Sequence, residues 1–584
     1  MRLTVRSVVF ALVVLSAVRL PVLWMPEAAA LERPWVSDVY FYWYTWDDEA
    51  ELGSWTNGVH HTPLQGYYDS RSLSDNLHSL RTASEWGLTH HFMDFWGMDW
   101  RDERGRPREA VVFEAAEALR DAGYGIHMGV YQDGSDFDVA DLSVNLDSGR
   151  QLRGLLERYG ASPVWPRIDG EPVHLVYARN GRPRPEIDGP GFRSWLQGRW
   201  SDLDRLNRAW ENEYRAWDEI AADPGGAGPR RAAASEYVLE RWREQWGSLE
   251  ASAREQLGIP GLTVSFDVGY GPYRDLGYGG LARIFGGPHS YAGIVGEPWE
   301  SDTDRFIQAQ VAKHHGTVFF DHFKNFYYDW GIRVPGRAYL PEPYRFDRFW
   351  VGALMRRSEA VLHLSWNEWW EGSNLEPCTE FGRTYCEKTL LYSTLMHRCF
   401  SDIRDRHRSA PVALLLNDYA IQARSEAAGD LRRAIVACRR LNVPFDLLPA
   451  DDVAADRLAR FRTVIAPACG VGFRPRPDGE AIASALLSWV RDGGNLIVSR
   501  DPELARRLGM REAPTDPSER DPGDDMNLFV DVGGDDDDAF LLSGKGHAEN
   551  WQNLPEDAFG HGANQTVRWL PVTGRSTRLS VPCS

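Results

Sequence analysis

Strand-like and helix-like segments alternate from residue 39 to about residue 400, and this rhythm constrains the fold more than any other feature. The expected strands are the apolar runs Val39–Tyr44, Thr89–Trp96, Gly125–Tyr131, Val173–Ala178, Leu262–Val268, Tyr291–Gly296, Thr317–Asp321 and Ala360–Trp366. The expected helices are Leu73–Trp86, Ala110–Asp121, Gln151–Tyr159, Ser235–Leu257, Thr303–His314 and Phe346–Arg357. This alternation predicts an α/β fold, and eight parallel strands are the number that closes a (β/α)₈ TIM barrel. An open doubly wound sheet is the competing fold, but no glycine-rich phosphate loop follows the first strand to support a nucleotide-binding version.

The rest of the chain divides by its patterns. We expect the barrel over residues 31–405, with a tryptophan-rich helical insertion at 189–233. A second alternation over 406–510 predicts a small α/β domain, with strands Val412–Leu416, Phe445–Leu448, Thr463–Ala466 and Asn495–Ser499 and helices Asp430–Leu441 and Ala481–Arg491. An acidic linker is expected at 511–526, and a β-rich tail at 527–584 has too few strands for a complete sandwich.

The first thirty residues have the features of a secretory signal peptide. Two arginines precede the apolar run Val8–Val18, and Ala28–Ala30 supplies small residues suited to cleavage. An apolar run of about a dozen residues is too short to span a bilayer as a helix. We therefore expect a secreted protein, extracellular or periplasmic, with an uncleaved N-terminal anchor as the alternative because Leu20–Met25 continues the apolar stretch.

Export would place the six cysteines in an oxidising compartment, where disulfides persist. Cys378 and Cys386 could staple one loop, and two free buried thiols are the equally open alternative. The cysteines form no CxxC or Cys/His pattern, so no structural metal is expected.

Charge and aromatic content narrow the ligand class. The formal net charge is −19, and an acidic surface repels phosphates, which disfavours a nucleic-acid groove. The chain has 24 Trp and 22 Tyr. Aromatic faces can stack on the apolar CH surface of sugars, although core packing is the ordinary use of each ring taken alone.

Polar and aromatic side chains recur where the expected strands end, which is the active face of a barrel. These candidate ligand-binding residues are Tyr44, Trp46, His60, His61, Asp94, Trp96, Tyr131, Asp267, Glu297, Asp321, Trp366, Asn367 and Trp369. Taken singly, an Asp at a strand end is more often a helix cap or a loop tie. Together they predict a concave site for a neutral, polyhydroxylated ligand.

The clearest chemical signal is the pair Glu368 and Glu371, immediately after the eighth expected strand. A helical turn would place both side chains on one face at about 5–6 Å, and an extended chain would separate them by about 10 Å. Glycoside cleavage needs two carboxyl groups, one protonated and one ionised. Trp366, Trp369 and Trp370 would lower the local polarity and keep one carboxyl protonated. Two surface glutamates at a helix start are the alternative.

At these residues the chain resembles a known family. The segment Ser365–Pro377, which includes Asn367, is similar to the N-E-W-x-E-G…(I/L)-E-P signature of the endo-α-mannosidase-like glycoside hydrolases of family 99. Tyr42–Tyr44, His60–Ser70 and Phe95–Gly97 resemble three further motifs of that family. The resemblance implies a retaining barrel glycosidase that acts on α-mannosides or similar sugars and uses the sugar's own 2-hydroxyl as nucleophile.

That resemblance also implies the roles of the two acids. Glu368 would be the base that deprotonates the 2-hydroxyl, and Glu371 the acid/base that serves the leaving oxygen and then the water. No metal or organic cofactor is implied. The sequence departs from the pattern at Trp370, where the mannosidases often have His, and in the helical insertion, and both departures concern the identity of the sugar more than the type of reaction.

Two other segments resemble barrel β-galactosidases. Phe192–Ala222 is similar to their F-x-x-WL…LN-x-AW segment, and 406–510 resembles their glutamine-amidotransferase-like domain, which implies packing and a homo-oligomer formed through this domain. The sequence therefore predicts a secreted hydrolase whose partner is a carbohydrate. A β-galactosidase-like enzyme and a non-catalytic carbohydrate-binding or cell-surface protein on a degenerate barrel are the alternatives.

Overall fold

The computed structural model describes residues 31–46, 55, 59–95, 105–133, 150–177, 187–259, 263–267, 276–284, 288–289, 302–324, 343–401, 410–424, 426–453, 455–467, 475–498, 568–569 and 577–578. The expected signal peptide, the strand Tyr291–Gly296 and the linker at 511–526 lie outside the described residues. In the tail, β14 (Arg568–Trp569) and β15 (Thr577–Arg578) form an antiparallel pair. No helix in the described ranges combines the length and apolarity that crossing a bilayer requires.

The pairing of parallel strands closes a ring in the first unit. Its strands within the described ranges are β1 (Trp35–Tyr40), β2 (His90–Phe95), β3 (His127–Asp133), β5 (Glu171–Tyr177), β6 (Thr263–Asp267), β7 (Pro288–His289), β8 (Phe320–Phe323) and β9 (Ala360–His363). Each pairs in parallel with the next, β3 pairs with β5, and β9 returns to β1. The short β4 (Arg167–Ile168) adds an antiparallel hairpin to β5. The pairing confirms the expected α/β barrel.

The barrel strands are buried on both faces, which is why the sequence shows them as nearly continuous apolar runs. Alternate residues point inward. Trp35 stacks on His90 at 4.3 Å between ring centroids and His90 on His127 at 4.6 Å, which fills the N-terminal end of the barrel. Phe92 meets Phe320 edge to face at 6.1 Å one layer higher. The next inward residue on β2 is Asp94, at the carboxyl end of the strand.

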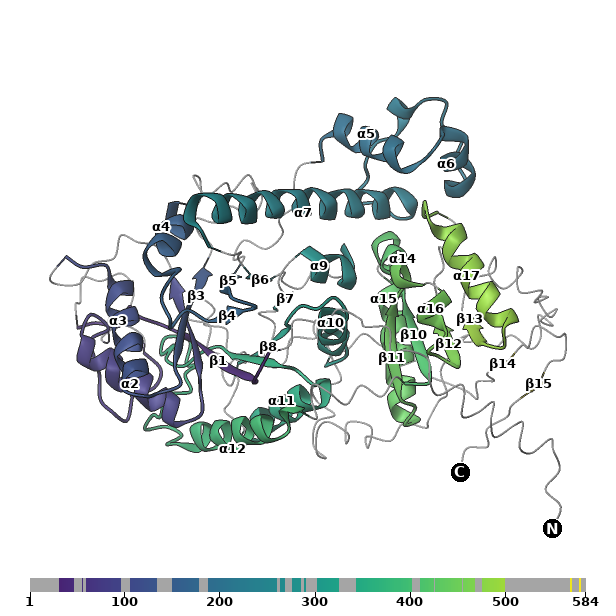
Figure 1. Ribbon diagram of the computed structural model, residues 1–584. Helices are drawn as coiled ribbons and strands as arrows, with labels where there is room; N and C mark the ends of the chain where they lie inside the picture. The colour runs from purple at the N-terminus through teal and green to yellow at the C-terminus, as the bar shows by residue number, and fades with distance from the viewer. Residues whose placement is uncertain are drawn as a thin grey trace, which may run out of the picture.

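Helices cover the outside of the ring. They are α2 (Leu73–Glu85), α3 (Arg108–Asp121), α4 (Arg150–Tyr159), α7 (Pro229–Leu257), α9 (Tyr278–Ile284), α10 (Asp302–His314), α11 (Pro343–Arg356) and α12 (Thr384–Arg398). Helix α7 begins six residues before the expected Ser235, because Pro229 at its first position has the backbone angle a helix needs. Figure 1 shows α7 running past the barrel towards the second unit.

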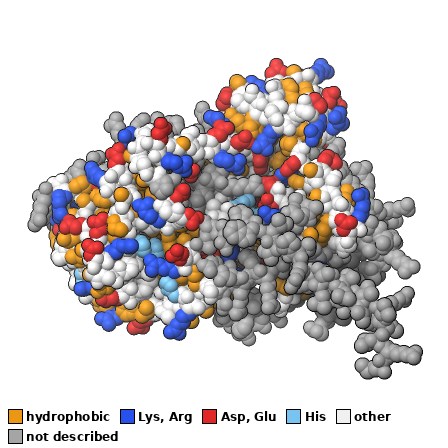
Figure 2. All heavy atoms as spheres, in the orientation of Figure 1, with side chains coloured by type: hydrophobic (Ala, Val, Ile, Leu, Met, Phe, Trp, Pro, Cys, Tyr) orange, Lys and Arg blue, Asp and Glu red, His pale blue; other side chains and the backbone are white. Residues whose placement is uncertain are grey.

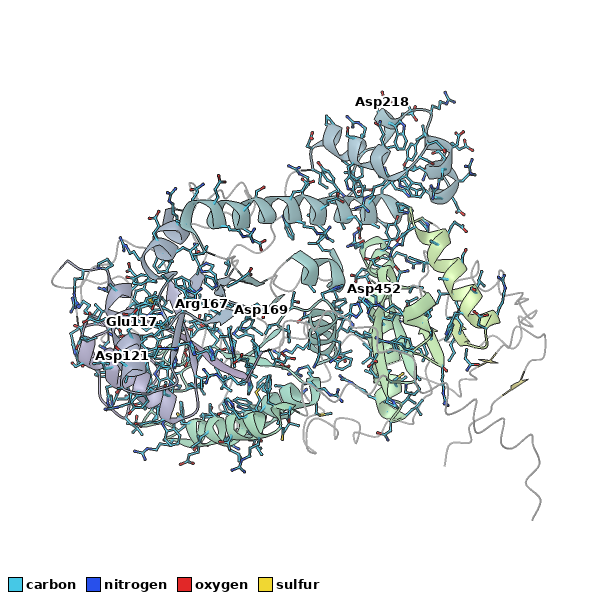
Figure 3. All side chains as sticks on the ribbon, in the orientation of Figure 1. Glu117, Asp121, Arg167, Asp169, Asp218 and Asp452 are labelled. Carbon is cyan, nitrogen blue, oxygen red and sulfur yellow. The ribbon has the colours of Figure 1, made fainter. Side chains whose placement is uncertain are left out.

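The helical insertion contains α5 (Gly189–Arg199), α6 (Leu203–Trp210) and the 3₁₀ turn η1 (Trp217–Glu219). A core of its own holds it together, formed by Phe192, Leu196, Trp200, Leu206, Trp210, Ile220, Ala233 and Tyr237. Asp218, labelled in Figure 3, lies on η1 in this insertion, above α7 in the view. The tryptophans of the insertion therefore serve packing.

The second unit is the small α/β domain that the alternation predicts. Its parallel sheet has the order β11 (Phe445–Pro449), β10 (Val412–Leu416), β12 (Thr463–Ala466) and β13 (Asn495–Val498). Its helices are α14 (Asp418–Ala423), α15 (Glu426–Arg440), α16 (Ala455–Leu458) and α17 (Gly479–Arg491), with the 3₁₀ turn η2 (Ala450–Asp452). A second buried core lies between this sheet and helices α16 and α17.

The small domain is attached to the barrel by specific contacts. The carboxylate of Asp418 accepts the backbone N–H groups of Tyr278 at 2.9 Å and Gly279 at 2.6 Å, at the start of α9. On the neighbouring helix α10, Phe306 meets Phe445 of β11 edge to face at 5.6 Å. Asp452, labelled in Figure 3, forms an ion pair with a histidine of α10. Figure 2 shows acidic and basic side chains interspersed over the described surface of this face.

Candidate active site

The chain leaves β9 and folds back in a tight turn that carries both candidate acids. Residues 369–372 form the turn, and the backbone N–H of Ser373 donates to the carbonyl of Glu368 at 3.1 Å. Gly372 has φ 61°, a left-handed conformation that glycine adopts without strain. The chain is therefore not extended here, and Glu368 and Glu371 lie in the same turn.

The two carboxyl groups of this turn have different surroundings. Glu368 is 8% exposed, and the hydroxyl of Ser373 donates to its Oε2 at 3.2 Å. Burial first, and then the negative charge of Glu371, raise the pKa of Glu368 well above its ordinary value. The side chain of Glu371 is 24% exposed, and its Oε2 accepts from Lys324 Nζ at 2.7 Å. The turn thus holds two carboxyl groups in unequal surroundings, one buried and one paired with a lysine.

Lys324 was not among the candidate site residues. It directly follows β8, and the alternation of that strand points it into the barrel with Phe320 and His322. Its side chain is 1% exposed, so little water screens its interaction with Glu371. The signal available in the sequence was its position at a strand end, since a lysine there can reach a carboxylate at a neighbouring strand end.

Asp94 and Tyr131 belong to the same end of the barrel. Asp94 of β2 lies opposite Tyr131 of β3 in the strand register, and both side chains are buried. The charge of Asp94 also raises the pKa of Glu368, after the contributions named above. Four chain segments therefore converge on one place: β2, β3, the residue after β8 and the turn after β9.

Aromatic rings form one side of this group. The backbone N–H of Trp369 donates to Tyr44 Oη at 2.7 Å. Burial, and next the charge of Glu368, raise the pKa of Tyr44 well above its ordinary value. Trp43 lies 6.3 Å from Trp370 between ring centroids. Trp43 and Trp370 lie within the motifs, but neither was expected to bind ligand.

A buried network behind the turn fixes its position. Asn367 donates to the backbone carbonyl of Phe41 at 2.8 Å and accepts from its N–H at 2.7 Å. Asn367 and Trp369 Nε1 also donate to the hydroxyl of Tyr68, at 3.0 and 3.1 Å. Tyr68 in turn donates to Glu376 at 2.9 Å. Asn367 and Trp369, both expected to bind ligand, therefore have their polar groups engaged in this network.

Glu376 ends the network in a fully buried place. Gln65 donates to its second carboxyl oxygen. Burial raises the pKa of Glu376 to about 8, while its two hydrogen bonds lower it. Glu376 lies beyond the turn, and these two hydrogen bonds engage both of its carboxyl oxygens.

Two further candidates point away from the site. Asp321 faces outward from β8, where it accepts from Arg356 Nε at 2.8 Å and Ser358 Oγ at 2.7 Å. The indole N–H of Trp366 donates to Ser79 of α2 at 2.9 Å. Both side chains are fully buried between the barrel and its helices. We therefore remove Asp321 and Trp366 from the substrate-binding set.

The two histidines lie on the connection between β1 and α2. The backbone N–H of His60 donates to the carbonyl of Trp369 at 3.1 Å, and burial lowers the pKa of its ring. His61 is buried, with its Nδ1 2.8 Å from Asn374 Oδ1. Trp46, on the same connection, is exposed. Asp267 ends β6, and Trp96 and Glu297 lie outside the described residues.

The structure corrects the suggested disulfide. Cys378 and Cys386 are both free and buried, and the thiol of Cys386 donates to the backbone carbonyl of Leu375 at 3.2 Å. Burial raises the pKa of the Cys378 thiol to about 12, so it is inert near neutral pH. Of the two alternatives left open by the sequence, the structure has the free thiols.

Comparisons with known proteins show which solved structures share this fold. No family model and no curated protein matches the chain. Two β-galactosidases, from Halorubrum lacusprofundi (16% identity, TM-score 0.54) and Marinomonas ef1 (13%, 0.55), each align over 80% of this chain and over 73% and 76% of their own. An endo-α-mannosidase from Bacteroides thetaiotaomicron (13%, 0.40) aligns over 63% of this chain and 98% of its own, a similarity too low to carry an argument. The chain therefore shares the fold of β-galactosidases over more than the barrel alone.

Proposed function

We propose that this protein is a glycoside hydrolase that cleaves an oligo- or polysaccharide with Glu368 and Glu371. The observation that supports this most is the unequal pair in the turn: one carboxyl buried among aromatic rings, the other 2.7 Å from a lysine. Hydrolysis of a glycosidic bond needs one carboxylic acid to protonate the leaving oxygen and one carboxylate at the anomeric side. Both groups lie at the carboxyl end of the barrel strands, where barrel enzymes place their chemistry.

We assign the acid role to Glu368 and the carboxylate role to Glu371. Glu368 is the group whose pKa burial raises, so it holds the proton in the resting protein. Lys324 stabilises a negative charge on Glu371, which would then either deprotonate the sugar's 2-hydroxyl or attack the anomeric carbon. This exchanges the roles that the family 99 resemblance implies. The tight turn favours a short separation of the two carboxyls and hence the retaining outcome.

Two different observations favour two different sugars. The motifs at 60–70 and 365–377 favour an α-mannoside. The fold shared with β-galactosidases over 80% of the chain favours a galactoside as the second candidate. The amino-terminal segment supports a secreted, extracellular or periplasmic protein, because it has the charge and apolar pattern of a signal peptide.

A leaving-group experiment tests both the activity and the role assignment. Wild type should hydrolyse α-mannan or galactan and the matching aryl glycosides. Glu368→Gln should lose activity on the polysaccharide but retain much of it on a dinitrophenyl glycoside, because that leaving group departs without protonation. Glu371→Gln should lose both activities, by at least about 100-fold, the low end for a positioned acid–base group.

Three results would count against the proposal. Hydrolysis of no glycoside by the folded wild-type protein would remove the enzyme assignment in favour of a carbohydrate-binding protein. The opposite behaviour of the two variants on the dinitrophenyl substrate would restore the roles implied by the resemblance. Full activity in both variants would move the chemistry to other residues.

A further inference from the structure

Two large apolar side chains stay exposed side by side on the connection between β1 and α2. Trp46 is 54% exposed and Tyr67 is 39% exposed. Their rings meet edge to face, with centroids 5.4 Å apart and planes at 81°. Single exposed apolar residues are common on soluble proteins, but adjacent exposed aromatic rings are a marker of a binding surface.

A buried tryptophan holds this exposed pair in place. Tyr67 packs on the ring of Trp55 at 4.7 Å between centroids. The indole N–H of Trp55 donates to the backbone carbonyl of Tyr68 at 2.6 Å, and its backbone N–H donates to Thr45 at 3.3 Å. Tyr67, which contacts Trp46, therefore rests on a buried ring that is tied to the loop backbone on both sides.

The same tryptophan connects the pair to the proposed catalytic turn. Trp55 stacks on Tyr44 at 4.7 Å, with 27° between the planes, and lies 6.1 Å from Trp369. Tyr44 accepts the backbone N–H of Trp369, the residue after Glu368. A continuous series of ring contacts therefore leads from the two acids to the exposed surface.

We propose that Trp46 and Tyr67 form a platform that binds a sugar residue further along the glycan than the linkage being cleaved. The proposal rests on the proposed function and adds the substrate class: an extended glycan, held at a distance from the acids. A pyranose presents apolar CH groups to an aromatic face while its hydroxyl groups stay in water. The net charge of −19 argues against a polyanionic occupant.

Substrate length provides the test. The double variant Trp46→Ala/Tyr67→Ala is compared with wild type on soluble α-mannan and on p-nitrophenyl α-mannoside, or on galactan and the galactoside if those are cleaved. The aryl glycoside has no further sugar residue that could occupy the platform. We expect kcat/KM on the polysaccharide to fall about 10- to 100-fold, as two lost aromatic stacking contacts imply, and kcat/KM on the aryl glycoside to stay within about twofold.

A matched control removes exposed apolar side chains elsewhere. Met355 of α11 is 53% exposed and Leu391 of α12 is 54% exposed, on helices that pack against each other outside the barrel. The variant Met355→Ala/Leu391→Ala should hydrolyse both substrates like wild type. An equal loss of both activities in the platform variant would mean that the rings merely support the catalytic turn, and this would overturn the proposal. Unchanged activity on the polysaccharide would overturn it as well.

Binding in the absence of turnover separates this proposal from the proposed function. In native gels that contain α-mannan or galactan, Glu371→Gln should be retarded, and Trp46→Ala/Tyr67→Ala in the same background should not. This binding experiment tests the platform proposal even if the wild-type protein hydrolyses none of the substrates. If neither polysaccharide retards Glu371→Gln, the platform proposal is wrong. It is also wrong if the platform variant changes the oligomeric mass in sedimentation, because the two rings would then mediate contact between two copies of the chain.

Discussion

Replacing Lys324 by methionine should shift the pH dependence of hydrolysis upward. The ammonium lies 2.7 Å from Glu371 Oε2 and is 1% exposed, so its field reaches the acid pair with little screening by water. Two unit charges about 4 Å apart interact by roughly 4 kcal/mol at an effective dielectric constant of about 20. Because Glu371 is partly exposed, we expect about a third to three quarters of this value, which corresponds to about one to two pH units.

Both limbs of the profile should move in the same direction. The active form has one proton on the pair, on Glu368, and one negative charge, on Glu371. Without Lys324 that single charge is less stable, so protonation inactivates the enzyme at a higher pH. Lys324 also lowers the pKa of Glu368, so its loss moves the alkaline limb upward too. Activity at about pH 6 should therefore fall, and the optimum should become more alkaline.

The assay is kcat/KM on an aryl glycoside between about pH 4 and pH 9. Lys324→Arg should keep the wild-type profile, because it retains the charge. Lys388→Met is the matched control: Lys388 forms an ion pair with Asp347 at 2.6 Å between α11 and α12, outside the barrel. Wild-type limbs in a Lys324→Met protein with an unchanged melting temperature would refute the electrostatic role of this lysine.

Three further predictions concern Glu376, Asp418 and the two buried cysteines. The raised pKa of Glu376 makes the wild-type protein lose stability as pH rises from about 4.5 to about 8, and Gln does not ionise. The stability of Glu376→Gln relative to wild type should therefore increase over this window, by up to a few kcal/mol. Scanning fluorimetry across this pH range measures the difference. Asp418→Ala should lower stability by about 1–3 kcal/mol, because the N–H of Tyr278 loses its acceptor and those of the next two glycines do too; denaturant unfolding that matches wild type would contradict this. Alkylation of the unfolded, unreduced protein should modify Cys378 and Cys386, and a peptide pair joined by a disulfide would show the free-thiol assignment to be wrong.

The architecture could be predicted because parallel strands buried on both faces leave apolar runs in the sequence. The bounds were less certain where apolar residues continue past a strand. The first strand was expected at Val39–Tyr44, but β1 ends at Tyr40. Beyond it, the backbone of Phe41 pairs with the side chain of Asn367, and Tyr44 packs among other rings. The aromatic run after Tyr40 is thus a loop that contributes to the candidate site, and hydropathy alone does not distinguish such a loop from a buried strand.

The site was predictable where its parts are close in sequence. Glu368 and Glu371 lie three residues apart, so a single turn brings them together whichever residues surround them. Lys324 lies 47 residues before Glu371, and its approach depends on the register of β8. The expected strand ended at Asp321, which placed this aspartate at the mouth of the barrel. In the structure β8 runs from Phe320 to Phe323, so Asp321 points outward in mid-strand and Lys324 takes the inward position at its end.

Strand register therefore decides which charge meets the acids. A shift of β8 by one residue would exchange the two faces of the strand, so that Asp321 would face the barrel interior and Lys324 would face away from it. A further carboxylate in the interior, together with the loss of the lysine, would disfavour the ionised member of the pair. Asp321 forms outward ion pairs with Arg356 and Arg305, and these oppose the shift. The shift would leave two buried guanidinium groups without their carboxylate, which is costly. A residue removed from the substrate-binding set thus contributes to the chemistry indirectly, by fixing the position from which Lys324 reaches Glu371.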